Sequence, residues 1–115
     1  MRSLFFKQRM IQQEMIDRGL YSGFLPDDAK VPCDSPKMMS YHIQHLVSEI
    51  GEVLEADKRW KSHRNEKYDR PAKIKEIADC FIVLFNLCIF SGIGFDEIAV
   101  EIHNKQNEVL NRMKN

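Results

Sequence analysis

Two pairs of acidic residues are the part of this chain whose side chains and spacing suit chemistry best. The pairs are Glu49 with Glu52, in HLVSEIGEVLEADKRW, and Glu76 with Asp79, in KIKEIADCFIVLF. Residues three apart on a helix lie on one face about one turn apart. If two such helices pack together, four carboxylates form a negative cage, which is costly unless a cation fills it because like charges repel. Since Mg²⁺ prefers oxygen ligands, we predict a Mg²⁺ site here, with Mn²⁺ as a substitute.

The elements that position these pairs follow from the spacing of apolar residues. This spacing predicts four helices, and a serine–proline step before the second is typical of a helix start. The predicted helices cover residues 3–18, 36 to about 61, 71 to about 91, and 95 nearly to the end. A long loop, 19–36, joins the first two. No strand pattern or repeat is present, so we predict an all-α fold that is packed like a four-helix bundle.

Apolar residues lie beside both acidic pairs. On the second predicted helix they form a stripe that we expect to face the core, with the carboxylates at its edge. The second half of the third helix, FIVLFNLCIF, is apolar nearly all round and therefore needs cover on all sides. In so small a domain we expect a subunit interface to provide it, and hence a homodimer or a dimer of dimers. The stripe on the second helix consists of Ile43, Leu46, Val47, Ile50, Val53 and Leu54.

Length, charge and cysteine content narrow the class of protein. A chain of 115 residues predicts one domain, 1–115. Its 17 basic and 17 acidic residues balance, so charge gives no reason to expect nucleic acid or a membrane surface as a partner. The three cysteines include no CxxC pair, and the N-terminus has no long apolar region of the kind found in signal peptides. We expect a reduced, cytoplasmic protein.

The paired motifs resemble those of a known superfamily. Alone, ExxE is common on solvated helices, but ExxE followed about two dozen residues later by ExxD is similar to the signature of the all-α nucleoside triphosphate pyrophosphatases. These include MazG proteins, dimeric dUTPases, dCTP pyrophosphatases and phosphoribosyl-ATP pyrophosphatases. HLVSEIGEVLEA resembles their first motif helix, and KEIADCFIVLFNLCIFSGI resembles their second. The resemblance covers residues 40 to 112 and points to the superfamily rather than to one substrate.

The resemblance implies a Mg²⁺-dependent pyrophosphohydrolase. Members of the superfamily bind Mg²⁺ with four carboxylates, which here would be Glu49, Glu52, Glu76 and Asp79. Water attacks the α-phosphorus of a nucleoside triphosphate and releases a nucleoside monophosphate and pyrophosphate. The metal neutralises phosphate charge and lowers the pKa of a bound water. A carboxylate that is not fully engaged by metal can accept the proton of water, and Glu49 and Glu52 are both candidates for this catalytic role.

Further candidates for substrate binding are basic or polar residues outside the motifs. The superfamily often carries K-x-x-x-N-x-x-R on its last helix; here Lys105 and Arg112 keep the spacing, although Val109 replaces the asparagine. Such a basic pair also has an ordinary role in solubility and in the helix dipole. Lys58 and Lys61 are candidate phosphate ligands or solvated cations. The candidate Asn86, in an apolar run, either contacts the sugar or base or forms a hydrogen bond across an interface.

Alternative functions remain open from the sequence. His42 and His45 lie on the same flank as Glu49, but the chain has no ExxH motif of the kind that di-iron bundles use. The departure at Val109 keeps a non-catalytic, nucleotide-binding or regulatory helical module as an alternative. A phosphoribosyl-ATP pyrophosphatase-like enzyme is another, because it shares the carboxylate chemistry.

Overall fold

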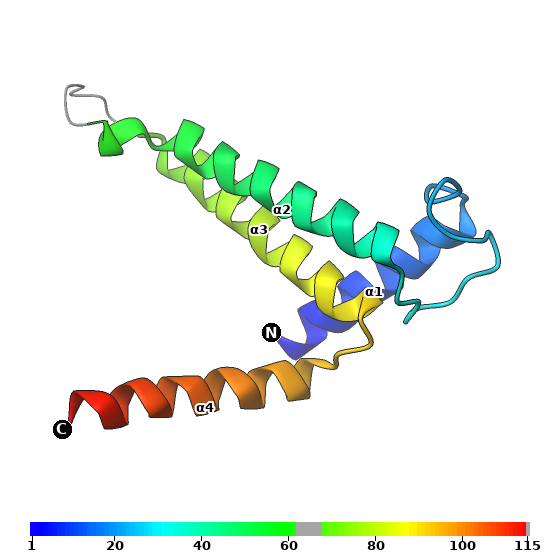
Figure 1. Cartoon of the computed structure of the whole chain (residues 1–115). Helices are drawn as coiled ribbons and strands as arrows, with labels where there is room; N and C mark the ends of the chain where they lie inside the picture. The colour runs from blue at the N-terminus through cyan, green and yellow to red at the C-terminus, as the bar shows by residue number, and fades with distance from the viewer. Residues whose placement is uncertain (62–67, 115) are drawn as a thin grey trace.

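The computed structural model describes residues 1–61 and 68–114 of the chain, and these residues contain helices and no strand. The elements are α1 (Arg2–Asp17), α2 (Pro36–Ala56), the short 3₁₀ helix η1 (Lys58–Trp60), α3 (Arg70–Phe90) and α4 (Phe95–Met113) (Figure 1). The predicted all-α class is confirmed. The second helix ends earlier than predicted, because the backbone becomes extended at Asp57 before η1 begins.

The centre of the fold is a hairpin in which α2 and α3 lie side by side along most of their length (Figure 1). Both helices begin at a proline and a capping side chain. Ser35 accepts a hydrogen bond from the backbone N–H of Met38 at 3.4 Å, and Asp69 accepts one from that of Ala72 at 3.3 Å. Such caps satisfy N–H groups that have no partner within the helix. The starts of both helices of the hairpin are therefore determined by residues close to them in the sequence.

Helix α1 packs across the second half of α3. The ring of Phe5 meets that of Phe85 edge-on, with centroids 5.4 Å apart, and Gln8 Nε2 donates a hydrogen bond to Asn86 Oδ1 at 2.9 Å. Phe5, Gln8 and Asn86 are all buried. Because each buried amide meets a partner, this contact avoids the cost of an unsatisfied polar group.

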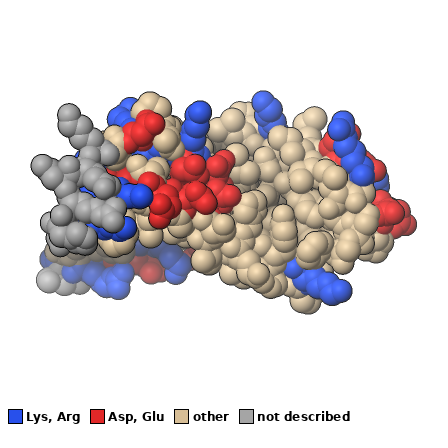
Figure 2. Space-filling view, turned by 90° about the horizontal axis from the view of Figure 1, so that it is seen from above, with Lys and Arg blue, Asp and Glu red and all other residues tan. Residues whose placement is uncertain are grey.

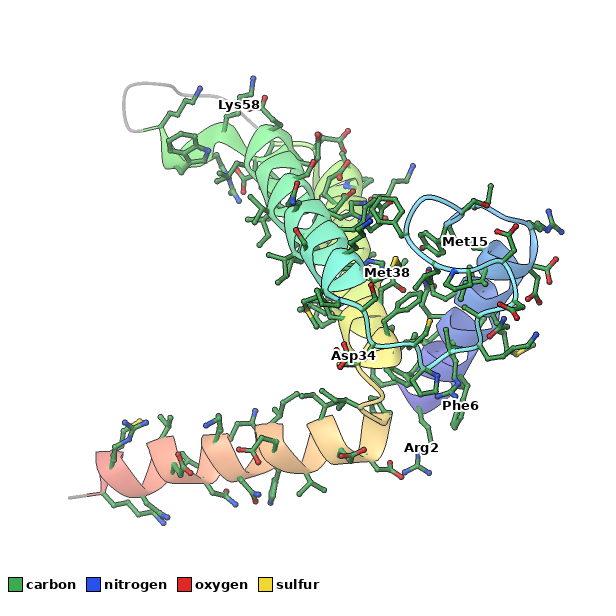
Figure 3. All side chains as sticks on the ribbon, turned by 45° about the vertical axis from the view of Figure 1, so that its right-hand side comes forward. Arg2, Phe6, Met15, Asp34, Met38 and Lys58 are labelled. Atoms are coloured by element: carbon green, nitrogen blue, oxygen red, sulfur yellow. The ribbon has the colours of Figure 1, made fainter. Side chains whose placement is uncertain are left out.

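The loop between α1 and α2 closes the core at one end of the hairpin. Tyr21 and Leu25 of this loop are buried against Met38 of α2, Phe90 of α3 and Ile16 of α1. Figure 3 labels Met38 at the start of α2 and Met15, which packs against the same cluster. The long loop, whose role the sequence left open, is thus an ordered connection that forms part of the core.

Helix α4 stands apart from the other three (Figure 1). Its axis is bent by 114° from that of α3, and Gly92, with φ of 73°, supplies the left-handed backbone at the end of α3. Its first turn contacts α1: the ring centroids of Phe95 and Phe5 are 5.9 Å apart, and Arg2 pairs with Asp96 at 2.7 Å. Every residue in the range 100–114 is exposed. A single chain therefore does not close the four-helix bundle that we predicted.

The apolar stripe predicted to face the core on α2 is largely exposed in the single chain. Four of its six residues are 47–65% exposed: Ile43, Val47, Ile50 and Leu54. The expectation that this stripe faces the core is not met within the single chain, where Glu49 of the neighbouring flank lies beside Glu76 and Asp79 of α3.

Among the residues described, no single helix is both long enough and apolar enough to span a membrane. The pair of α3 and α4 has the length and composition of a span only when the two helices are joined across their 114° bend.

Candidate metal centre

Three of the four predicted metal ligands meet at the seam between α2 and α3. One carboxylate oxygen from each of Glu49, Glu76 and Asp79 lies within 4.8 Å of the others. We call these three residues the acidic triad. Figure 2 looks down on the side of the hairpin turned away from α4, and acidic side chains gather there in one patch. The helix spacing read from the sequence thus brings together two carboxylates from α3 and one from α2.

The open end of the hairpin is held by a network of charged groups that sequence reasoning missed. Asp57 follows α2, and its carboxylate accepts hydrogen bonds from Arg59 Nε and Nη2 at 2.8 Å each and from Lys73 Nζ of α3 at 2.8 Å. The Arg59 guanidinium also lies 3.5 Å from the centre of the Tyr68 ring. The Asp57 network links α2 to α3 one turn before Glu76 and so helps to position the triad.

Negative charge is concentrated at the acidic triad. The pKa of Glu76 is raised, first by desolvation and then by the charges of Asp79, Glu52 and Glu49. Desolvation, followed by the charges of Glu49, Asp79 and Glu76, also raises the pKa of the Cys80 thiol. Within residues 1–61 and 68–114, no Lys or Arg side chain pairs with any of the four predicted ligands. A cation from outside the chain would relieve this repulsion.

Glu49 has a single polar partner among the described side chains. Its Oε1 lies 3.0 Å from Nε2 of His45, one turn earlier on α2. The Glu49 side chain is 18% exposed and that of His45 is 39% exposed. His45 therefore orients the Glu49 carboxylate from the N-terminal side of α2. The His45 ring itself remains accessible.

Glu52 lies outside the acidic triad. It is exposed and not among the three residues whose oxygens approach one another, although its charge contributes to the raised pKa of Glu76. The structure therefore separates the four predicted ligands into three that converge and one that stands beside them. A carboxylate near a metal site but outside the ligand set is free to accept a proton.

The other predicted substrate-binding residues lie away from the triad or have partners of their own. Lys58 Nζ pairs with Glu55 at 3.5 Å at the end of α2, and Lys61 Nζ lies 5.3 Å from the Trp60 ring. Asn86 is 4% exposed and accepts its hydrogen bond from α1. This hydrogen bond is formed within the chain, a contact that neither of the two predicted roles of Asn86 included.

The basic pair on α4 does not approach the triad of its own chain. Lys105 pairs with Glu101 on the same helix at 3.8 Å, and Arg112 is exposed near the C-terminus. Helix α4 diverges from the hairpin, on the side opposite to the acidic patch (Figures 1 and 2). Any contact between this pair and the triad needs another copy of the chain.

The burial of His42 was not predicted from the sequence. It is 1% exposed, and neither ring nitrogen has a hydrogen-bond partner among the described residues. Its ring stacks on Phe90, with centroids 5.0 Å apart. The helical spacing put His42 on the Glu49 flank, but its burial depends on Phe90 of α3 and on Tyr21 of the loop between α1 and α2.

The chain was compared with known proteins in three ways. No family model, no curated protein and no solved structure matches it. The function is therefore argued from the residues and their geometry.

Proposed function

We propose that this chain is a Mg²⁺-dependent nucleoside triphosphate pyrophosphohydrolase, which cleaves NTPs or dNTPs to the monophosphate and pyrophosphate. The observation that carries the proposal is the convergence of three carboxylate oxygens from two helices within 4.8 Å, with no basic partner among the described residues. The donor set suits the metal, because Mg²⁺ takes hard oxygen ligands and is commonly held by carboxylates together with substrate phosphates. The paired motifs and their resemblance to the pyrophosphatase superfamily support the same reaction.

The roles of the residues follow from their positions. Glu49, Glu76 and Asp79 would hold Mg²⁺, which would polarise the phosphate oxygens and neutralise their charge. His45 would keep the Glu49 carboxylate oriented through its 3.0 Å contact. Glu52, outside the ligand set and exposed, would accept the proton of the attacking water. Of the two candidates for the general base, Glu52 is therefore the one that the geometry favours.

A homodimer, or a dimer of dimers, completes the proposal. An α-helix gains most of its stability from packing, yet α4 has no buried residue. Between α1 and α3 lies an apolar groove of about 480 Å³, with Leu4, Ile11, Phe81 and Phe85 in its lining. A second copy of the chain would cover both surfaces at once, and it would bring a second pair of Lys105 and Arg112 into the assembly.

The test of the reaction is pyrophosphate release. The full-length protein would be incubated with Mg²⁺ and a panel of canonical and modified NTPs and dNTPs. Release from one or a few nucleotides is expected, and it should stop when Mg²⁺ is chelated. If a folded protein released no pyrophosphate from any nucleotide of the panel, the proposal would be contradicted. Tight nucleotide binding without release would instead identify a non-catalytic nucleotide-binding module.

The test of the assembly is the molar mass in solution. Light scattering coupled to gel filtration should give a multiple of the 13.5 kDa chain mass. Replacing Phe81, which is 49% exposed in the groove, by Glu should shift the mass towards that of one chain. A wild-type protein that elutes with the mass of one chain at all concentrations would contradict the proposed dimer.

A further inference from the structure

A patch of aromatic rings lies next to the acidic triad, on the first turns of α2. Its accessible members are Phe24 of the loop and Tyr41 and His45 of α2; we call these three residues the aromatic patch. The Phe24 and Tyr41 rings are 5.3 Å apart, and the Tyr41 and His45 rings are 5.9 Å apart. Phe24 is 41% and Tyr41 is 37% exposed. These rings present an aromatic surface that a flat ligand can reach.

The aromatic patch packs against a layer of buried rings. Tyr41 meets the buried rings of His42, at 5.1 Å, and Tyr21, at 6.2 Å. His42 in turn stacks on Phe90 of α3. The exposed rings therefore rest on a packed core and are already oriented without a ligand, which lowers the entropic cost of binding.

The aromatic patch and the acidic triad are directly connected. His45 belongs to the patch and contacts Glu49 of the triad at 3.0 Å. At a helical rise of about 1.5 Å per residue, His45 lies ~6 Å and Tyr41 ~12 Å from Glu49 along the axis of α2. A nucleotide has its flat base and its phosphates at opposite ends of one small molecule, so it can extend across both surfaces.

The chemistry of the aromatic patch suits an uncharged ring rather than a phosphate. Burial, followed by the nearby charge of His45, lowers the pKa of His42 to about 4, so the ring beneath Tyr41 is neutral near pH 7. The groups that face His42 are Tyr21 of the loop, Tyr41 and His45 of α2, and Phe90 of α3. None of these is a permanent cation, whereas base rings stack on aromatic side chains with little regard to sequence.

We propose that Phe24, Tyr41 and His45 form the subsite on which the nucleobase stacks while the phosphates of the same nucleotide face the acidic triad. This inference rests on the proposed function, because it requires a nucleotide at the triad.

The experiment compares a ligand that has a base with one that lacks it. Isothermal titration with Mg²⁺ would measure the Kd of α,β-methylene nucleoside triphosphates, which resist cleavage between the α- and β-phosphorus, and of inorganic tripolyphosphate. The proteins would be the wild type, Tyr41→Ala, Phe24→Ala and, as the matched control, Tyr41→Phe. Circular dichroism and gel filtration of every variant would report the fold and the oligomeric state.

The expected result is selective. Tyr41→Ala should weaken nucleotide binding about tenfold, because the contribution of stacking on one aromatic ring is of that order. Phe24→Ala should weaken nucleotide binding in the same direction. The Kd of tripolyphosphate should stay unchanged in both variants, and Tyr41→Phe should bind both ligands like the wild type, because the ring is kept.

Several results would overturn the inference. Unchanged nucleotide binding in both alanine variants would remove the base subsite and leave the proposed function intact. Equal weakening of nucleotide and tripolyphosphate would mean that Tyr41 acts through the fold or the triad. A changed oligomeric state with unchanged nucleotide binding would identify the patch as a subunit contact. A wild type that binds neither ligand with Mg²⁺ would overturn the proposed function and the inference with it.

Discussion

The α2–α3 hairpin holds two clusters of charged groups, the Asp57 network and the acidic triad, whose carboxylates have opposite surroundings. At its open end, Asp57 accepts hydrogen bonds from Arg59 and Lys73, which hold the pKa of its carboxyl well below the usual range. One turn further along α3, the pKa of Glu76 is raised by partial burial and by the carboxylates around it. The first cluster is neutralised by Arg59 and Lys73 of the chain itself, whereas in the second no Lys or Arg of residues 1–61 and 68–114 pairs with the carboxylates.

Under the proposed function, this difference separates a structural site from a binding site. A carboxylate that already has cationic partners gains little from an added cation, because its charge is compensated. Converging carboxylates without basic partners among the described residues repel one another, and a bound cation would relieve that repulsion. We therefore interpret the Asp57 network as a link that holds the hairpin together, and we propose that the acidic triad binds the cation.

The largest effect should follow from removing a ligand of the triad. Asp79→Asn keeps the shape of the side chain but removes its charge, and we expect the rate of pyrophosphate release to fall more than about 100-fold, beyond the loss typical for residues that only support metal ligands. Glu55→Gln is the matched control, since Glu55 is exposed on the same hairpin and pairs only with Lys58 among the described residues. Equal rates in Asp79→Asn and wild type, with unchanged helical content, would contradict the account.

Adding or removing Mg²⁺ should change the stability of the fold through the triad alone. At about 100 times its Kd, a ligand that binds only the folded state stabilises it by about 2.7 kcal/mol. We expect the Tm of the wild type, at fixed protein concentration, to rise with Mg²⁺ and to return with EDTA. The Asp57→Asn variant should keep this response and the Asp79→Asn variant should lose it. Loss of the Mg²⁺ response in Asp57→Asn alone would reverse the assigned roles.

Neutralising one carboxylate in each cluster should have effects of opposite sign in the absence of metal. Asp79→Asn removes repulsion and should raise the Tm by a few degrees, whereas Asp57→Asn breaks the hydrogen bonds to Arg59 and Lys73 and should lower it. Thermal melts by circular dichroism in EDTA would show both shifts. A fall in Tm for both variants would mean that the triad is also a stabilising element.

The smallest expected effect is a change in the stability of the fold at low pH. The pKa of Asp57 is lower in the folded chain than its ordinary value of 3.8. Its stabilising contribution is therefore fully present above pH 3.8 and is lost as the pH falls from there towards the folded-state pKa. The difference in Tm between wild type and Asp57→Asn should be constant near neutral pH and should shrink below pH 4. A difference that stays constant down to pH 3 would contradict the assigned network.

The parts of the fold that could be predicted from the sequence are those set by neighbouring residues. The Ser35 cap and the proline after it identified the start of α2, and the spacing of Glu76 and Asp79 placed both carboxylates on one turn of α3. The convergence of Glu49 with them followed from two such helices packing together. The exclusion of Glu52 from this group could not be predicted in this way, because it depends on which flank of α2 meets α3.

The remaining features depend on contacts between distant residues. Asp57 bonds to Lys73 sixteen positions away, and His42 is buried by a loop that carries Tyr21. No local pattern encodes either contact. The apolar period of α4 predicted a helix but could not show what covers it, and in the single chain its residues 100–114 are all exposed.

The most direct test of the acidic triad as a cation site is a titration with Mn²⁺, followed by electron paramagnetic resonance of the free ion. The wild type should bind Mn²⁺ at the triad and Mg²⁺ should displace it, because both ions take oxygen ligands. The Asp57→Asn variant should bind like the wild type, and Asp79→Asn and Glu49→Gln should bind far more weakly. Equal binding by wild type, Asp79→Asn and Glu49→Gln, or no binding by the folded wild type, would contradict the central claim.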